Sequence, residues 1–233
     1  MRTVFISGAT GYIGRPLTEA LLRAGFDVLA LARPQSLRKL PIGCRPIPGD
    51  ALRASTFTDE VPAGSTVVHL TGVAHPSPAK AAAFRAIDRV SFEASLEAAM
   101  RARAAHFVYV SVAHPAPVMK EYIRVRTECE RMLADSGLAA TVLRPWYVLG
   151  PGHWWPYLLK PFYTLAALRP EWKATSEHLG LVTHAQMLRA LEYAVENPPA
   201  LGTNVLDVPA IRAAQPRRSL GIAIGSLEAP RPF

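Results

Sequence analysis

The sequence predicts an α/β fold built on a doubly wound parallel sheet. Short β-rich runs alternate with amphipathic helical stretches, which is the pattern that such a sheet requires. The β-rich runs consist mainly of Val, Ile, Leu and Phe without polar alternation, as expected for strands that are buried on both faces. A length of 233 residues suits one domain of this class with a modest extra region.

The expected elements begin at the first residues and keep a regular rhythm up to residue 144. Strands are expected at Thr3–Ser7, Asp27–Ala32, Arg45–Pro48, Thr66–Leu70, His106–Ser111 and Ala140–Leu143, and helices at Gly14–Ala24, Phe84–Arg103 and Val118–Ser136. An aromatic and Pro-rich stretch follows, and then a strand at Gly180–Thr183, a helix at His184–Glu196 and a strand at Asn204–Val208. We therefore predict one domain over residues 1–212, with residues 145–212 as a small C-terminal substrate region, and a Pro/Arg-rich tail at 213–233.

Composition narrows the choice of partner and compartment. A net charge of +8 is compatible with nucleic-acid binding, but the basic residues are scattered, and a small anionic ligand explains a basic cleft equally well. Two cysteines are too few for a disulfide framework, and the histidines lack metal-ligand spacing. No apolar run of about twenty residues is present, and the chain begins directly with a strand. We expect a cytoplasmic protein without transmembrane segment, metal or nucleic-acid partner.

The first strand leads directly into Gly8-Ala9-Thr10-Gly11-Tyr12-Ile13-Gly14, and a helix follows. The first glycine permits a sharp turn, the second lets the backbone approach a pyrophosphate, and the third lets the helix pack closely on the sheet. The helix N-terminus then offers N–H groups and its dipole to phosphates. The segment therefore predicts a Rossmann-like phosphate loop that binds a dinucleotide.

The spacing of this loop resembles that of the short-chain dehydrogenase/reductase superfamily. It is most similar to the extended and atypical branches, which are relatives of the NAD-dependent epimerases and dehydratases. A second match is the segment from Arg144-Pro145 to Gly150-Pro151-Gly152, which resembles the family's R-P-x-x-x-x-G-P-G segment near the nicotinamide carboxamide. The resemblance covers roughly residues 1–210. It implies cofactor contacts from Gly8, Thr10, Gly11, Tyr12, Ile13, Gly14, Arg33, Asp50, Ala51, Leu70, Thr71, Gly72, Pro145 and Tyr147.

The end of the second expected strand favours NADP(H) over NAD(H). NAD-dependent enzymes usually place an acidic residue there to bind the ribose 2′-hydroxyl. This chain has Arg33, followed by Arg38 and Lys39, and a guanidinium can bind a 2′-phosphate through two hydrogen bonds. Arg15 is also within possible reach, and Asp50 either meets the adenine amino group or caps a following helix.

The expected catalytic residues depart from the family pattern. The resemblance implies a Tyr-x-x-x-Lys pair, and the matching positions are Tyr122 and Arg126, which share a helix face. An Arg cannot shed a proton and has a different shape from Lys, although it can still bind the nicotinamide ribose. The substrate-orienting hydroxyl falls at Val112, whereas Ser111 serves if the alignment shifts by one residue. The Asn expected in the preceding helix is replaced by Asp88.

The aromatic stretch Trp146–Pro170 indicates either a partly apolar substrate or an interface, since exposed aromatic side chains also mark contacts between proteins. A homodimer built on the helices Phe84–Arg103 and Val118–Ser136 is a further possibility by analogy. His184 is expected to begin a helix rather than to act chemically.

Two functions remain open. The first is an NADP(H)-dependent oxidoreductase or epimerase-like enzyme in which Tyr122 handles a proton and Arg126 fixes the ribose. The second is a protein that keeps the dinucleotide without the chemistry, as in NmrA-like redox sensors and the NAD(P)H-binding accessory subunit of respiratory complex I. The altered Tyr-x-x-x-Arg motif favours the second function, whereas the complete glycine loop serves both.

Overall fold

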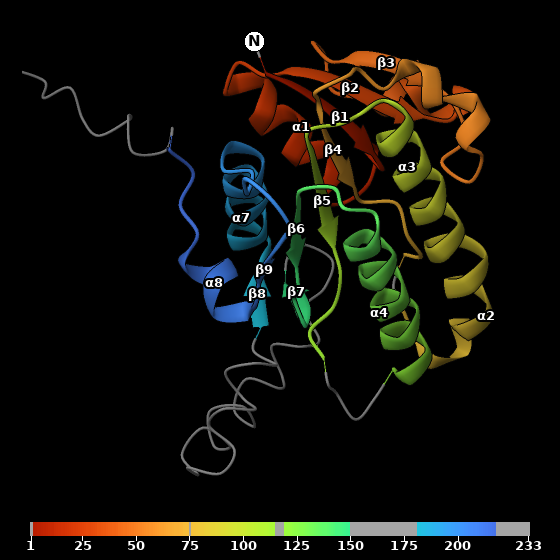
Figure 1. The fold of residues 1–233 in the computed structure, drawn as a ribbon, viewed down its shortest axis with the longest axis vertical. Coiled ribbons are helices and arrows are strands. Elements are labelled where there is room, and N and C mark those ends of the chain that lie inside the picture. The colour runs from red at the N-terminus through yellow and green to blue at the C-terminus, as the bar shows by residue number, and fades with distance from the viewer. Residues whose placement is uncertain (1, 75, 115–118, 150–180, 218–233) are drawn as a thin grey trace, which may run out of the picture.

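The computed structural model describes residues 2–74, 76–114, 119–149 and 181–217 (Figure 1). Its centre is a seven-stranded sheet in the order β3-β2-β1-β4-β5-β6-β9, and every neighbouring pair is parallel. The prediction of a doubly wound parallel sheet is confirmed. The strands are β1 Thr3–Ser7, β2 Asp27–Ala32, β3 Arg45–Pro48, β4 Thr66–His69, β5 His106–Val110, β6 Ala140–Leu143 and β9 Thr203–Leu206.

Helices cover both faces of the sheet (Figure 1). Helices α1 (Gly14–Arg23) and α7 (His184–Glu196) pack on one face, and α3 (Val90–Arg101) and α4 (Lys120–Asp135) pack on the other. A short helix α2 (Ala81–Ala83) and a π-helical segment, Phe84–Arg89, lead into α3. Short 3₁₀ turns occupy Pro34–Lys39, Ala54–Thr56, Thr58–Glu60 and Pro78–Lys80.

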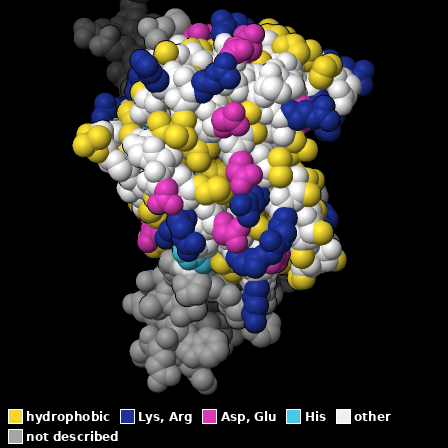
Figure 2. Space-filling model, turned by 45° about the vertical axis from the view of Figure 1, so that its right-hand side comes forward, with side chains coloured by type: hydrophobic (Ala, Val, Ile, Leu, Met, Phe, Trp, Pro, Cys, Tyr) yellow, Lys and Arg dark blue, Asp and Glu magenta, His cyan; other side chains and the backbone are white. Residues whose placement is uncertain are grey.

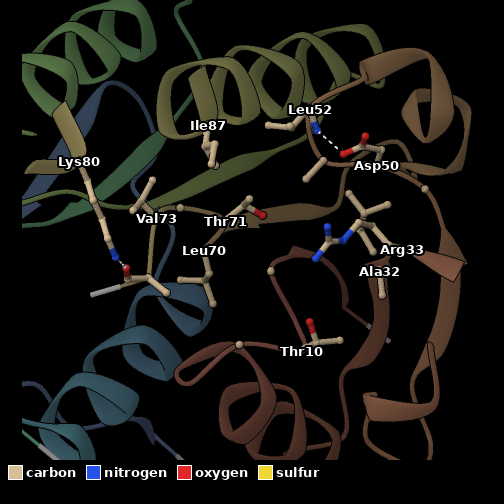
Figure 3. Close-up of a pocket in the computed structure, with 17 residues that line it drawn as sticks. Thr10, Ala32, Arg33, Asp50, Leu52, Leu70, Thr71, Val73, Lys80 and Ile87 are labelled. Atoms are coloured by element: carbon tan, nitrogen blue, oxygen red, sulfur yellow. Dashed lines mark hydrogen bonds between the residues drawn. The ribbon is translucent and has the colours of Figure 1, made fainter. Parts of the chain in front are cut away.

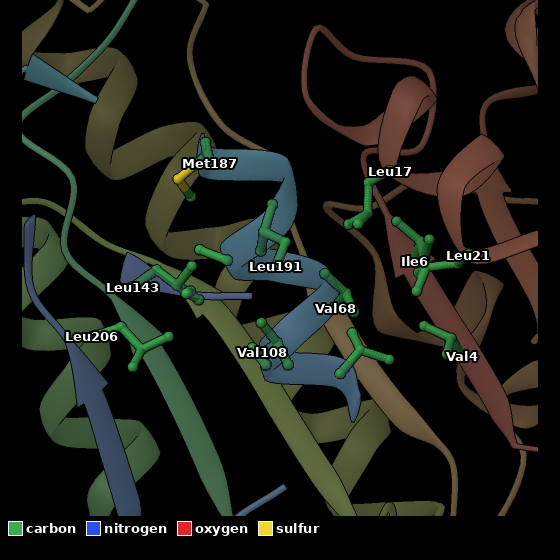
Figure 4. Close-up of a cluster of buried hydrophobic side chains, with 14 of the residues drawn as sticks. Val4, Ile6, Leu17, Leu21, Val68, Val108, Leu143, Met187, Leu191 and Leu206 are labelled. Atoms are coloured by element: carbon green, nitrogen blue, oxygen red, sulfur yellow. The ribbon is translucent and has the colours of Figure 1, made fainter. Parts of the chain in front are cut away.

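Each strand divides its side chains between two apolar cores, because successive residues point to opposite faces. In β1, Val4 and Ile6 pack under α1 and α7, whereas Phe5 packs under α3 and α4. Figure 4 shows the first core, in which Leu17 and Leu21 of α1 and Met187 and Leu191 of α7 meet the strands. Burial on both faces explains why the strand sequences are apolar throughout.

The C-terminal region differs from the expectation in two places. The expected strand Asn204–Val208 is β9, which ends at Leu206. Val208 instead begins helix α8 (Val208–Ala213). Asp207 caps the N-terminus of this helix, because its carboxylate accepts from the Ala210 N–H at 3.0 Å. An additional strand, β7 (Tyr147–Leu149), begins two residues after Pro145 and pairs with β8 (Leu181–Thr183) in a separate two-stranded sheet. Most of the aromatic stretch, Gly180 and tail residues 218–233 lie outside the described residues.

The outer surface of α3 and α4 is charged. Figure 2 shows acidic and basic side chains interspersed over this side of the molecule. Ion pairs within the chain join Arg85 and Arg124 to Glu121, Arg89 to Glu93 and Glu128, and Arg124 to Glu128. A homodimer through these two helices remains a prediction, and it would have to cover charged groups that already have partners.

Candidate functional site

A pocket of about 570 Å³ lies at the carboxyl edge of the sheet, between the loops that follow β1, β2, β3 and β4 (Figure 3). Strand β1 has β2 on one side and β4 on the other, so the chain connections diverge at this point. Open parallel sheets bind their ligands at such a switch point. The topology therefore places the glycine loop where a ligand-binding crevice is expected.

Two glycines of this loop are required by the local packing. Gly8 has a φ of +89°, and a Cβ atom there would lie 2.7 Å from the backbone carbon of Leu70. A Cβ atom at Gly14 would lie only 2.1 Å from the carbonyl oxygen of Gly8. No side chain can occupy either position without a shift of the backbone.

The loops after β1 and β4 are bonded to each other. The hydroxyl groups of Ser7 and Thr71 lie 2.6 Å apart, and the Leu70 N–H donates to the Ser7 carbonyl at 2.9 Å. Thr71 and Gly72 line the pocket opposite the glycine loop. The two walls of the pocket are thus held at a defined separation.

Arg33 and Asp50 lie at one end of the pocket (Figure 3). Arg33 is exposed, and within the described ranges its guanidinium has no hydrogen bond or ion pair. One carboxylate oxygen of Asp50 accepts from the Leu52 N–H at 3.0 Å, which closes a turn rather than caps a helix. Arg15 lies outside the pocket lining, where it pairs with Glu19 at 3.4 Å. Of the two arginines proposed for a 2′-phosphate, Arg33 is the one that reaches this cavity.

The structure brings most of the expected cofactor residues into this one cavity. Those that line it are Gly8, Thr10, Gly11, Arg33, Asp50, Ala51, Leu70, Thr71 and Gly72. The expected residues outside the lining are Tyr12, Ile13, Gly14, Pro145 and Tyr147, together with the expected catalytic residues Ser111, Tyr122 and Arg126.

Several lining residues were missed by sequence reasoning. The most polar is Lys80, whose ammonium group donates to the Ala74 carbonyl at 2.6 Å, at the end of the pocket far from Arg33 (Figure 3). It lies in a loop without periodic pattern, so no sequence signal marks it. The other missed residues are Leu31, Ala32, Gly49, Leu52, Val73, Ala74 and Ile87.

Tyr122 and Arg126 lie one turn apart on α4, as the sequence predicts. The Tyr122 ring is half-buried and packs against Phe84, with ring centroids 4.9 Å apart. The Arg126 guanidinium lies over the same ring at 5.0 Å and is buried. The two side chains therefore contact each other, but the guanidinium lies in the interior rather than in the cavity.

Arg126 forms an ion pair with Asp88, and both side chains are buried. Burial raises the pKa of the Asp88 carboxyl, and the adjacent Arg126 partly offsets this. Burial also opposes the charge on Arg126, but Tyr109, Tyr122 and Asp88 together raise its pKa. Because a guanidinium does not lose its proton in a protein, we take the pair to be ionised.

The hydroxyl expected near the reacting centre lies in the interior. Ser111 is 2% exposed, and its hydroxyl has no hydrogen bond among the described residues. Val112, at the alternative register position, is 3% exposed and is therefore also buried. Neither residue lines the pocket.

The C-terminal region contacts the glycine loop through His184, which is the first residue of α7, as expected. Thr183 and Gln186 form a capping box that begins this helix. The His184 ring packs on Tyr12 with centroids 4.5 Å apart, and its Nε2 donates to the Tyr12 carbonyl at 3.1 Å. Tyr12 thus joins two parts of the chain.

A family model described as NAD(P)H-binding matches residues 8–150, which is more than half of the chain. The chain belongs to this family. A nicotinamide dinucleotide is therefore its cofactor, and the pocket has features that suit such a ligand: the glycines of a tight turn and an exposed guanidinium.

Relatives of similar sequence are reductases by name. A divinyl chlorophyllide a 8-vinyl-reductase from Oryza sativa subsp. indica is 32% identical over 158 residues, which are 61% of this chain and 39% of that protein. A 3-diazoavenalumate denitrifying reductase from a Streptomyces species is 35% identical over 175 residues, or 64% of this chain and 57% of that protein. The matched region thus spans about half of these relatives or less.

Solved structures of similar fold include the Bordetella bronchiseptica enzyme WbmH in complex with NAD⁺ and a UDP-N-acetylglucosamine 4-epimerase from Bacillus cereus. The first has a TM-score of 0.64 at 20% identity and covers 89% of this chain and 75% of its own. The second has a TM-score of 0.65 at 18% identity and covers 89% and 79%. At these identities the likeness shows the fold alone.

Neither a membrane-spanning helix nor a cluster of metal ligands is present in the described residues. No helix there has the length and apolarity that a membrane span needs. Likewise, no group of three or more His, Cys, Asp and Glu side chains in that part of the chain is arranged to hold a metal ion.

Proposed function

We propose that this protein is an NADP(H)-dependent reductase that acts on a partly apolar small molecule. The observation that carries the proposal is the pocket itself, in which the glycine turn and the guanidinium of Arg33 face the same cavity. The named relatives support reduction as the reaction, and their different names leave the acceptor group open.

The positive charge of Arg33 is the reason to expect a preference for NADP(H). A 2′-phosphate at the Arg33 end of the pocket would meet a guanidinium that has no other partner among the described residues. Two parallel N–H···O bonds would then form, and these are stronger than bonds between neutral groups. Asp50 lies on the same rim, where one of its carboxylate oxygens accepts from the Leu52 N–H.

The proposed reaction adds a hydride and a proton across a C=O or C=C bond. The bound dinucleotide would supply the hydride, and Tyr122 would donate its phenolic proton to the other atom of the acceptor bond. The Tyr122 ring contacts both Phe84, with centroids 4.9 Å apart, and the Arg126 guanidinium, at 5.0 Å, and these contacts restrict its position. Solvent returns the proton to Tyr122 after the product leaves.

Cofactor titration tests the proposal directly. We expect NADPH to bind at least tenfold more tightly than NADH, measured by the fluorescence of the reduced cofactor. Arg33→Asp should remove or reverse this preference, because a carboxylate repels the 2′-phosphate and accepts from a 2′-hydroxyl. Arg38→Asp is the matched control, since Arg38 is also exposed but does not line the pocket. Equal effects of both variants, or no binding of either cofactor, would contradict the proposal.

A second candidate function is a cofactor-binding sensor or accessory protein without turnover. The observation that favours it is the replacement of the expected Lys by Arg126, which is buried in an ion pair, together with the apolar Val112 at a hydroxyl position. Turnover on panels of carbonyl and quinone compounds separates the two functions. If Tyr122→Phe lowers the turnover rate at least a hundredfold and leaves cofactor binding unchanged, the result supports the reductase. Retention of one redox form without any turnover supports the sensor.

A further inference from the structure

The ion pair between Asp88 and Arg126 connects three elements behind the pocket. Asp88 belongs to the π-helical segment, and Arg126 to α4. The Arg126 Nη2 lies 2.5 Å from the Asp88 Oδ1, and its Nη1 donates to the Val110 carbonyl of β5 at 2.8 Å. The Tyr109 hydroxyl is a further acceptor for Nη1, at 3.2 Å. Both terminal nitrogens of the guanidinium therefore have partners within the fold.

The pair also touches the pocket wall from behind. The second carboxylate oxygen of Asp88 accepts from the Val73 N–H at 2.9 Å. At Gly72, a Cβ atom would lie 2.9 Å from the Arg126 Nη2 and 3.0 Å from the Asp88 Oδ1. Gly72 and Val73 both line the pocket, as does Ile87, the neighbour of Asp88 in sequence. The pair thus supports the backbone on which the ligand would lie.

Charge balance explains why both residues depart from the family pattern together. An arginine at position 126 brings a permanent charge into a buried place, and a buried charge without a partner is strongly destabilising. An Asn at position 88 would leave that charge unpaired, whereas Asp88 neutralises it. The carboxylate keeps a second acceptor for Val73, so one side chain serves both the cation and the loop.

We propose that Asp88 and Arg126 are positioning residues, which together hold the Gly72–Val73 backbone as the floor of the dinucleotide pocket without contacting the cofactor. The proposal rests on the proposed function, because it assigns the loop to the NADP(H) site. It also replaces the expected role of Arg126, which was a direct bond to the nicotinamide ribose.

A double-mutant cycle tests this proposal. Asp88→Asn leaves a buried cation, and Arg126→Met leaves a buried anion, so each single variant should raise the Kd for NADPH at least tenfold. The double variant D88N/R126M leaves no charge and keeps an acceptor for the Val73 N–H. Its Kd should return to within about threefold of the wild-type value, and the emission maximum of bound NADPH should return with it. Arg124→Met, an exposed position on the same helix, is the matched control and should change neither quantity.

The outcomes separate the alternatives. A double variant that stays as weak as Arg126→Met overturns the proposal, because Arg126 then touches the cofactor itself. Single variants that lose stability but keep the wild-type Kd also overturn it, since the pair is then structural only. A wild-type protein that binds neither NADPH nor NADH overturns the proposed function as well, whereas normal wild-type binding with unchanged variants removes only the positioning role.

Gly72→Ala covers the case in which a single variant does not fold. This substitution keeps both charges and places a methyl group against the pair. We expect it to raise the Kd at least tenfold in the wild-type background but less than threefold in D88N/R126M, where a flexible Met side chain can move aside. Equal effects in the two backgrounds would overturn the proposal.

Discussion

The two ends of the dinucleotide site are built in different ways. At the glycine loop the site consists mainly of backbone and small residues, and the expected glycines Gly8, Gly11 and Gly14 are all present. The side nearer α4 depends on long side chains, and there the expected Lys and Asn have become Arg126 and Asp88. A close approach of two backbone segments tolerates no added atom, whereas two paired charged side chains can be replaced if both are replaced together.

Substitution of Gly14 should have the largest effect, because the backbone has no room to adjust. In Gly14→Ala the new Cβ atom would lie 2.1 Å from the Gly8 carbonyl oxygen, so the turn and the start of α1 must move. We expect a loss of roughly 3 kcal/mol or more in the free energy of unfolding and no measurable NADPH binding. Denaturant titration and cofactor fluorescence measure the two effects.

Gly137→Ala is the matched control for that variant. Gly137 has a φ of +73° and nothing within 4 Å of a Cβ atom, so the cost is limited to backbone strain of about 1 kcal/mol. Its cofactor binding should be unchanged. If Gly14→Ala behaved like this control, the backbone-built end of the site would be no stricter than an ordinary turn.

Stability at acid pH probes two buried histidines of the central sheet, His69 of β4 and His106 of β5. Burial, with a smaller contribution from Arg126, lowers the pKa of His69 to about 3, and burial lowers that of His106 to about 4. Both residues take up protons in the unfolded chain near pH 6.5, so their stabilising contribution is present above that pH and is lost as the pH falls toward 4. Between pH 7 and pH 5 we expect a loss of about 4 kcal/mol in the free energy of unfolding from the two residues.

Variants of single histidines show which residue causes this loss of stability. His106→Gln should remove about half of the dependence, because His106 bonds to Thr141 at 2.9 Å in the buried sheet and cannot be hydrated there. His69→Gln is the comparison, since His69 is also buried, with its Nδ1 2.9 Å from the Ser95 hydroxyl, and should account for the other half. If the free energy of unfolding falls equally steeply with pH in the wild type and in His106→Gln, the buried imidazole of His106 is not the source of the pH dependence.

Sequence reasoning was most successful where a single residue decides the local geometry. Gly8 and Arg33 each follow a strand, and their places in the pocket follow from the sheet topology alone. Lys80 was missed because its loop has no period and reaches the pocket only through tertiary folding. Helix α8 was missed although Asp207 followed by Val208-Pro209 is a recognisable helix start.

The Asp88–Arg126 pair shows a different limit of the sequence. Both departures from the family pattern were visible in the chain, but their contact was not, because 38 positions separate them. The π-helical segment adds to the difficulty, since its wider turn changes which residues share a face. The contact arises only in the fold, which brings the π-helical segment and α4 together beside Gly72.

The smallest expected effect concerns the link between the glycine loop and the C-terminal region. His184→Ala removes the ring that packs on Tyr12 and the bond to the Tyr12 carbonyl. Both groups are partly exposed, so the free energy of unfolding should fall by no more than about 1 kcal/mol. The Kd for NADPH should rise about two- to threefold, which corresponds to the lower end, about 0.5 kcal/mol, of the net value of one hydrogen bond. His184→Phe, which keeps the ring but not the donor, separates packing from hydrogen bonding: if its Kd matches that of His184→Ala, the Nε2 donor holds the loop, and if it matches the wild type, the ring contact does.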